Sequence, residues 1–159
     1  MDFSKFDKAF NLDDLKKDVK DAQENGANFR EVPHGTYEVK IERLELTMSN
    51  TDKDGRIKDK DKLQKPMVSV WFKILEGEFK DSLIFYNQLV DEGFKINIMN
   101  EFLKSLESEV KIYFDSFSQY NNLILDVHED IDGRLEYLLS YKKNKKGFDS
   151  YRIKEVYEL

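Results

Sequence analysis

The chain has 159 residues, the length of one ordinary domain, and its 40% hydrophobic and 13% aromatic content excludes an intrinsically disordered protein. Its 26 basic and 32 acidic residues give a net charge of -6, so the chain as a whole is not a basic nucleic-acid coat. The absence of cysteine excludes disulfides, thiolate metal sites and a cysteine nucleophile, and is typical of a reducing compartment. Because neither a membrane-spanning apolar run nor a signal peptide is visible, we expect a cytoplasmic protein.

Residues 1–30 are predicted to form a helical extension that precedes the main domain. Between residues 11 and 25 the apolar side chains recur at spacings of three and four: Leu12, Leu15, Val19 and Ala22. Gly26 follows as a helix terminator. We therefore expect an amphipathic N-terminal helix, and we place the main domain at residues 31–159.

A long first strand is predicted from Thr36 to Ser49, after a turn at Pro33-His34-Gly35. Large apolar residues occupy odd-numbered positions up to Ile41 and even-numbered positions from Leu44 to Met48. Both sets can face one core only if the strand contains an extra residue near Glu42-Arg43. Such a bulge bends a sheet enough to close a small barrel.

The charged segment that follows, NTDKDGRIKDKDKLQ over residues 50–64, matches part of a calcium-loop template. The positions that fit are Asn50, Asp52, Asp54, Gly55, Ile57 and Asp61. However, the last position carries Asp instead of a bidentate Glu, several side chains are basic, and no flanking helices are expected. We predict no calcium, and we leave open whether the lysines of this loop contact nucleic acid or are simply solvated.

Residues 65–88 are predicted to form a hairpin with a two-residue turn at Glu76-Gly77. Counting outward from that turn gives the pairs of the core face: Val70 with Leu83, Val68 with Phe85 and Ile74 with Phe79. It gives the other face a mixture of aromatic and cationic residues: Met67 with Tyr86, Ser69 with Ile84, Trp71 with Ser82 and Lys73 with Lys80.

Two interpretations of this second face are open. The N-terminal helix or a partner subunit covers it, which would make Trp71 part of a second small core. Alternatively the face binds single-stranded nucleic acid, since bases stack on aromatic rings and lysines neutralise phosphates. We favour the second interpretation because a barrel exterior has no packing reason to show aromatic rings among lysines.

Two helices and two strands are predicted for the remainder of the chain. The first helix carries a stripe formed by Phe94, Ile98, Phe102 and Leu106, widened by Met99 and Leu103. The second spans residues 116–131, and strand-like alternation from Leu135 to Tyr157 is broken by a turn at KNKKG. We therefore expect a mainly β protein, a five-stranded oligonucleotide/oligosaccharide-binding (OB) barrel with helices between strands three and four.

The charge is unevenly distributed along the chain. Residues 101–136 carry three basic and nine acidic groups, whereas residues 137–159 carry six basic and three acidic groups. The last hairpin is therefore predicted to be locally cationic in an acidic protein.

Four stretches carry a resemblance to a known family: VPHGTYEVKIERLELTMS, KPMVSVWFKILEGEFKDSLIFYNQ, GFKINIMNEFLKSL and KKGFDSYRIKEVYEL. By order and extent, over nearly the whole chain, they resemble bacteriophage single-stranded DNA-binding proteins from phages of Gram-positive bacteria, long known only as a domain of unknown function. The resemblance implies an OB barrel that coats single strands in phage replication or recombination, in the host bacterial cytoplasm. Residues 50–64 form a longer loop than we would expect in that family.

We accordingly predict sequence-tolerant single-stranded DNA binding by a homo-oligomer, with phage or host replication and recombination proteins as further partners. The predicted DNA-binding residues are Lys65, Met67, Trp71, Lys73, Lys80, Tyr86, Lys142, Lys143, Lys145, Lys146 and Arg152. The alternative is an OB module that binds proteins in a replication or recombination complex without touching DNA. We expect no enzyme, cofactor or metal, because His34 and His128 show no link to a nucleophile or a metal-ligand spacing.

Overall fold

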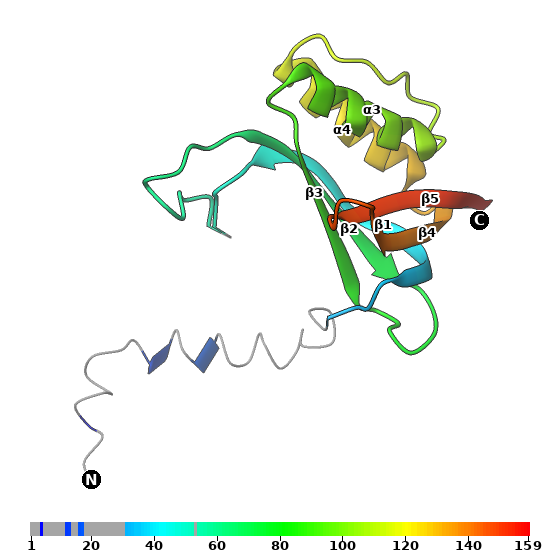
Figure 1. Cartoon of the computed structure of the whole chain (residues 1–159), viewed down its shortest axis with the longest axis horizontal. Coiled ribbons are helices and arrows are strands. Elements are labelled where there is room, and N and C mark those ends of the chain that lie inside the picture. Colours follow the sequence, from blue (N-terminus) through cyan, green and yellow to red (C-terminus); the bar gives the residue numbers. More distant parts are fainter. Residues whose placement is uncertain (1–3, 5–11, 14–15, 18–30, 53) are drawn as a thin grey trace.

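The computed structural model of the chain describes residues 4, 12–13, 16–17, 31–52 and 54–159 (Figure 1). Its elements are, in chain order, β1 (Gly35–Met48), β2 (Pro66–Ile74), β3 (Leu83–Leu89), α3 (Gly93–Ser105), α4 (Phe117–Ile131), β4 (Leu135–Lys143) and β5 (Asp149–Glu158). The helix predicted for residues 11–25 lies outside the described residues, apart from positions 12–13 and 16–17. Among the described residues, no helix has both the length and the apolar character needed to cross a membrane.

The five strands form one antiparallel sheet in the order β3-β2-β1-β4-β5. The central strand β1 serves two neighbours, because its segment from Val39 to Met48 pairs with β2 and its segment from Gly35 to Val39 pairs with β4. The register of β1 against β2 shifts between Ile41 and Arg43. This irregularity confirms the extra residue predicted near Glu42-Arg43, and it lets Ile41 and Leu44 both enter the core.

Strands β3 and β5 are the two edges of the sheet, and aromatic rings bring them together. The rings of Tyr86 on β3 and Tyr151 on β5 stack with centroids 4.5 Å apart and planes inclined by 18°. Tyr151 also stacks on Phe72 of β2 at 6.3 Å. No ladder of backbone hydrogen bonds joins β3 to β5 in the described part of the chain. We call this aromatic junction between the two edge strands the seam.

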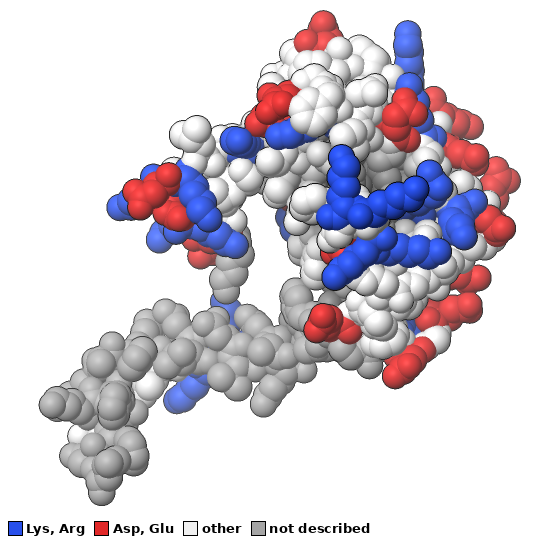
Figure 2. All heavy atoms as spheres, viewed as in Figure 1, with Lys and Arg blue, Asp and Glu red and all other residues white. Residues whose placement is uncertain are grey.

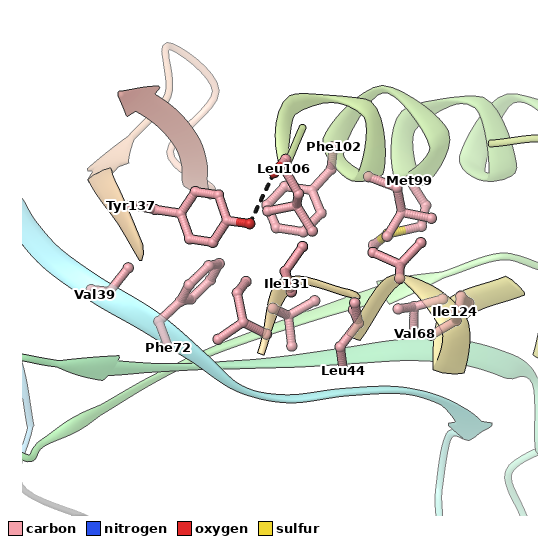
Figure 3. Packing of buried hydrophobic residues seen from close by; sticks show 14 of the residues in the cluster. Val39, Leu44, Val68, Phe72, Met99, Phe102, Leu106, Ile124, Ile131 and Tyr137 are labelled. Carbon is pink, nitrogen blue, oxygen red and sulfur yellow. Dashed lines mark hydrogen bonds between the residues drawn. The ribbon is translucent and has the colours of Figure 1, made fainter. Parts of the chain in front are cut away.

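The two helices lie together over one end of the sheet and complete the core (Figure 1). Figure 3 shows Phe102 and Leu106 at the end of α3 facing Tyr137 of β4, whose hydroxyl donates to the carbonyl oxygen of Leu106 at 2.9 Å. Helix α4 begins where the side chain of Ser116 accepts a hydrogen bond from the backbone N–H of Gln119 at 3.1 Å. This buried hydrogen bond fixes the end of α3 to the sheet.

The apolar stripe predicted for α3 is only half buried. Met99, Phe102 and Leu103 face the core, as does Leu106 just beyond the helix. Phe94 and Ile98, by contrast, are 61% and 47% exposed. The part of the predicted stripe near the end of α3 therefore faces the core, whereas Phe94 and Ile98 lie on the surface.

The predicted pairing of β2 with β3 is wrong by three residues. Trp71 lies opposite Phe85 and not opposite Ser82. The strands are joined by residues 75–82, not by a two-residue turn: Gly77 and Asp81 have φ angles of 86° and 69°, and the N–H of Asp81 donates to the carbonyl of Ile74 at 2.8 Å. Because an odd shift moves every side chain of a strand to the opposite face, the side chains of β3 exchange faces relative to the prediction.

Candidate nucleic-acid interface

One row of side chains crosses the outer face of β1, β2 and β3. Arg43 lies opposite Trp71 in the sheet, and Trp71 lies opposite Phe85. The guanidinium carbon of Arg43 stands 4.6 Å from the centroid of the Trp71 ring, and the Phe85 ring meets the Trp71 ring edge-on at 5.3 Å. We call Arg43, Trp71 and Phe85 the platform. It joins a cation to two aromatic rings on a surface that points away from the core.

Local sequence explains why these three side chains face outward. Val70 and Phe72 are fully buried, so Trp71 between them points to the other face of β2. The extra residue in β1 turns Arg43 to that same face. Phe85 remains 38% exposed, while Ile84 beside it is buried. The platform is thus a product of strand alternation plus one bulge.

The next row of this face is polar. Ser69 of β2 donates a hydrogen bond to the side-chain oxygen of Asn87 on β3 at 2.9 Å. On β1, Glu45 forms an ion pair with Arg43 at 2.8 Å. This pair holds the guanidinium beside Trp71 but also places one acidic group next to the platform, where it opposes the approach of a phosphate.

Tyr86 does not belong to the platform, contrary to the prediction. It pairs with Val70 on the core side of the sheet, where its ring stacks on Tyr151 and meets Phe102 edge-on. Its hydroxyl donates to the side-chain oxygen of Gln88 at 3.2 Å, and burial raises the pKa of the phenol to about 12. Phe85, which the sequence assigned to the core, is instead the ring beside Trp71 on the outer face, and Leu89 lies opposite Met67, where Tyr86 was predicted.

The other predicted residues in and next to β2 lie around the platform, and two of the lysines form ion pairs with acidic side chains. Met67 and Lys73 share the outward face of Trp71. The ammonium of Lys73 lies 3.9 Å from Asp81, and that of Lys65 lies 3.5 Å from Asp91. Lys80 is exposed in the connection between β2 and β3 and does not pair with Lys73, because that stretch is not a strand.

The turn between β4 and β5 presents an exposed cationic surface, as the sequence predicted. Its exposed basic residues are Lys142, Lys143, Lys145, Lys146 and Arg152. The side-chain oxygen of Asn144 accepts the N–H groups of Lys146 and Phe148 at 2.9 and 3.1 Å, and Gly147 supplies the positive φ of 84° that closes the turn. Figure 2 shows basic side chains gathered where this hairpin lies in Figure 1. We call these five residues the cationic hairpin.

The connection between β1 and β2 projects from the rest of the molecule, and open space separates it from the cationic hairpin (Figure 2). Basic and acidic side chains are mixed on it. Asn50 organises it: its amide nitrogen donates to the carbonyls of Asp59 and Lys62, and its amide oxygen accepts the N–H of Asp59. Asp52 accepts the N–H groups of Asp54 and Arg56, both at 2.9 Å. Two side chains of the calcium template therefore serve to fold this loop on itself.

Both histidines have partners in the structure. His34 Nε2 lies 2.8 Å from Asp149 Oδ1, and the His34 ring packs against Tyr141 with centroids 4.6 Å apart. His128 Nε2 lies 3.3 Å from the carbonyl oxygen of Ile41. These contacts tie the start of β1 to β5, and α4 to the middle of β1.

Sequence reasoning missed Arg43 and Phe85. The sequence did contain a signal for Arg43, namely the bulge predicted after Ile41. With that bulge, Arg43 is the next outward side chain of β1, and it lies opposite Trp71 of β2. For Phe85 no comparable signal exists, because LIFYNQ has large side chains at both parities and its pattern fits either register.

Stability at alkaline pH follows from the tyrosines of the seam. Burial raises the pKa of Tyr86 to about 12, and burial followed by the charge of Asp149 raises the pKa of Tyr151. An unfolded phenol ionises near pH 10, so the stability that these groups contribute is fully present below about pH 10 and is lost as the pH rises toward about 12. We expect tyrosinate absorbance and loss of circular dichroism to rise together in that window. Ionisation of all eight tyrosines near pH 10 with the fold intact would contradict this expectation.

Comparisons with models of protein families, with curated proteins and with solved structures find no match to this chain.

Proposed function

We propose that this protein binds single-stranded DNA with little sequence preference, on a surface formed by the platform and the cationic hairpin. The observation that carries the proposal is the row Arg43, Trp71 and Phe85, in which a cation and two rings stand outward on adjacent strands. Bases stack on aromatic rings at roughly 1 to 3 kcal/mol each, and basic side chains neutralise the phosphates between them.

The strand order supports an OB barrel as the scaffold. A central first strand shared by β2 and β4, together with a bulge and two edge strands drawn together by Tyr86 and Tyr151, is how a five-stranded sheet closes on itself. In OB folds the ligand surface consists of strands two and three with the loops after strands one and four. Here those elements are β2, β3, the loop that Asn50 organises and the cationic hairpin.

The resemblance to single-stranded DNA-binding proteins of phages of Gram-positive bacteria gives this proposal a biological setting. We infer a role in phage DNA replication or recombination, in which the protein covers single strands as they are exposed. The acidic excess of residues 101–136 belongs to the helical part of the molecule, so the net charge of -6 leaves the proposed surface locally cationic.

A fluorescence titration tests the proposal directly, because the chain has one tryptophan and it lies in the platform. Adding oligo(dT) is expected to quench Trp71 emission as bases stack on the ring. The logarithm of the binding constant should fall with the logarithm of salt concentration, with a slope of about 0.7 per phosphate neutralised on a single strand. Unchanged emission together with no shift of a labelled oligonucleotide in a gel would overturn the proposal.

A protein-binding module is the second candidate function, and one observation favours it. A groove of about 640 Å³ lies between the end of β1, the start of β2 and the start of α4, and its apolar walls include Leu46, Met48 and Phe117. The exposed Phe94 and Ile98 of α3 add further apolar surface. Size-exclusion mass, measured with and without oligonucleotide, separates a protein or self-association surface from a nucleic-acid surface.

A further inference from the structure

A pocket of about 220 Å³ opens in the seam, directly beside the platform. Aromatic, aliphatic and acidic residues line it: the aromatic ones are Phe85, Tyr141 and Tyr151, and the acidic ones are Glu31 and Asp149. This volume is several times the ~30 Å³ share of one water molecule, so it has room for a flat ring system. We call it the seam pocket.

The tyrosines of the pocket are held as a stack. The rings of Tyr141 and Tyr151 lie 5.4 Å apart with planes inclined by 19°, and Tyr151 continues the stack onto Tyr86. Stacked rings of this kind offer a rigid flat wall at little cost in side-chain entropy, because the rings are already fixed by each other. The pocket therefore has a wall of rings that hold one another in place, against which a planar ligand can pack.

Two carboxylates give the pocket its polar character. Asp149 Oδ1 faces His34 Nε2 at 2.8 Å, and Asp149 Oδ2 lies 3.5 Å from the Tyr141 hydroxyl. Both carboxylates line the pocket with Tyr141, and burial, followed by the charge of Asp149 and then that of Glu31, raises the pKa of the Tyr141 phenol. A carboxylate has about four acceptor sites, so these contacts leave acceptors for a ligand that brings N–H groups.

The pocket shares one residue with the proposed DNA surface. Phe85 belongs both to the platform and to the pocket wall. At the other end, Lys143, which belongs to the cationic hairpin, lies opposite Asp149 in the β4–β5 ladder. A strand that crosses Trp71 and Phe85 toward the hairpin therefore passes the mouth of the pocket.

We propose that the seam pocket receives one base of the bound strand and prefers a base that carries an exocyclic amino group, such as cytosine, over thymine or uracil. This inference rests on the proposed function. Acidic side chains accept hydrogen bonds from the amino group of cytosine. Uracil presents carbonyl oxygens on both sides of its ring N–H, and these repel a carboxylate. Binding that is tolerant of sequence elsewhere would thus have one selective position.

An arginine side chain of a partner protein would also satisfy stacked rings and carboxylates. The surroundings favour a base over that occupant, because the exposed Lys142, Lys143, Lys145 and Lys146 repel a basic peptide and attract a polyanion. The carboxylates would then meet the neutral base edge while the lysines meet the phosphates.

Competition between dC and dU oligonucleotides of about 12 nucleotides, near the site size of one OB fold, tests the inference by fluorescence anisotropy at fixed salt. The two bases share one ring size, and uracil removes the thymine methyl from the comparison. We expect the natural protein to bind dC about tenfold more tightly than dU.

The double variant Glu31→Gln with Asp149→Asn should reduce this ratio to about twofold or less while dU affinity holds or rises, because two negative charges are removed. Glu129→Gln, an exposed change on α4, is the charge control and should preserve the ratio.

The outcomes separate the two proposals. Tight binding of both oligonucleotides with equal affinity overturns the seam pocket as a base site and leaves the proposed function standing. Binding of neither oligonucleotide overturns the proposed function and the inference with it. If an oligo-arginine peptide binds and the double variant abolishes that binding while dC and dU remain equal, the pocket is a protein site and the inference is wrong.

Discussion

Replacing Trp71 with alanine is expected to weaken single-stranded DNA binding by roughly 1 to 3 kcal/mol, about 5- to 150-fold in dissociation constant. The indole is the largest ring of the platform, and it is held in place by Arg43 at 4.6 Å and by Phe85 at 5.3 Å. Because Trp71 points away from the core, its removal should leave the fold intact. Anisotropy of a labelled oligo(dT) is the appropriate measurement, since the variant has no tryptophan to observe.

Tyr113 provides a matched control for this experiment. It is 47% exposed in the connection between α3 and α4, and the ammonium of Lys111 stands 5.9 Å from its ring centroid. It therefore repeats the combination of ring and cation outside the sheet. Tyr113→Ala should bind oligo(dT) like the natural protein. Equal affinities of Trp71→Ala and Tyr113→Ala would show that the platform does not stack on bases.

Several features of the fold were predictable because one physical pattern permits only one solution. The change of parity between Ile41 and Leu44 requires an extra residue if both side chains are buried, and the structure has it there. The KNKKG segment, with a glycine between two alternating runs, marks the β4–β5 turn for a similar reason. In both places the sequence excludes the competing arrangements.

The β2–β3 register could not be predicted, since two arrangements satisfied the same pattern. Gly77 does adopt a positive φ, but it does so within a longer connection that ends at Asp81 and Ser82. The apolar residues of β3 occupy both parities, so no alternation opposed the shorter turn. The hydrogen bonds between Ile74 and residues 81–82 decide the register, and these depend on the three-dimensional path of the loop.

The sequence predicted where the candidate site lies, on the outer face of β2, better than it predicted which side chains form it. Strand β2 alone placed Trp71 and Lys73 on the outer face, because Val70 and Phe72 are too apolar for solvent. The partners of Trp71 came from neighbouring strands, where a bulge and a register decide which side chain arrives. Arg43 and Phe85 occupy those places, and Tyr86 supports the seam from the core side.

Phe72→Ala is expected to lower the free energy of unfolding by roughly 3 to 5 kcal/mol, since it removes a fully buried ring and leaves a cavity. Phe72 meets Phe102 edge-on at 6.0 Å and stacks with Tyr151 at 6.3 Å, so its loss weakens contacts both to α3 and to the seam. Urea unfolding followed by circular dichroism measures the change. A loss of about 1 kcal/mol or less would contradict this packing, given the usual cost of a Phe to Ala change in a core.

Phe85→Ala makes the same chemical change on the adjacent strand and serves as the matched control. Its ring is 38% exposed on the outer face, so its removal should cost about 1 kcal/mol or less of stability while weakening single-stranded DNA binding. The two-residue turn would instead place Phe85 in the core beside Val68, and both variants would then be destabilised alike. A large difference in stability between Phe72→Ala and Phe85→Ala therefore tests the register itself, and equal losses would restore the shorter turn and remove Phe85 from the platform.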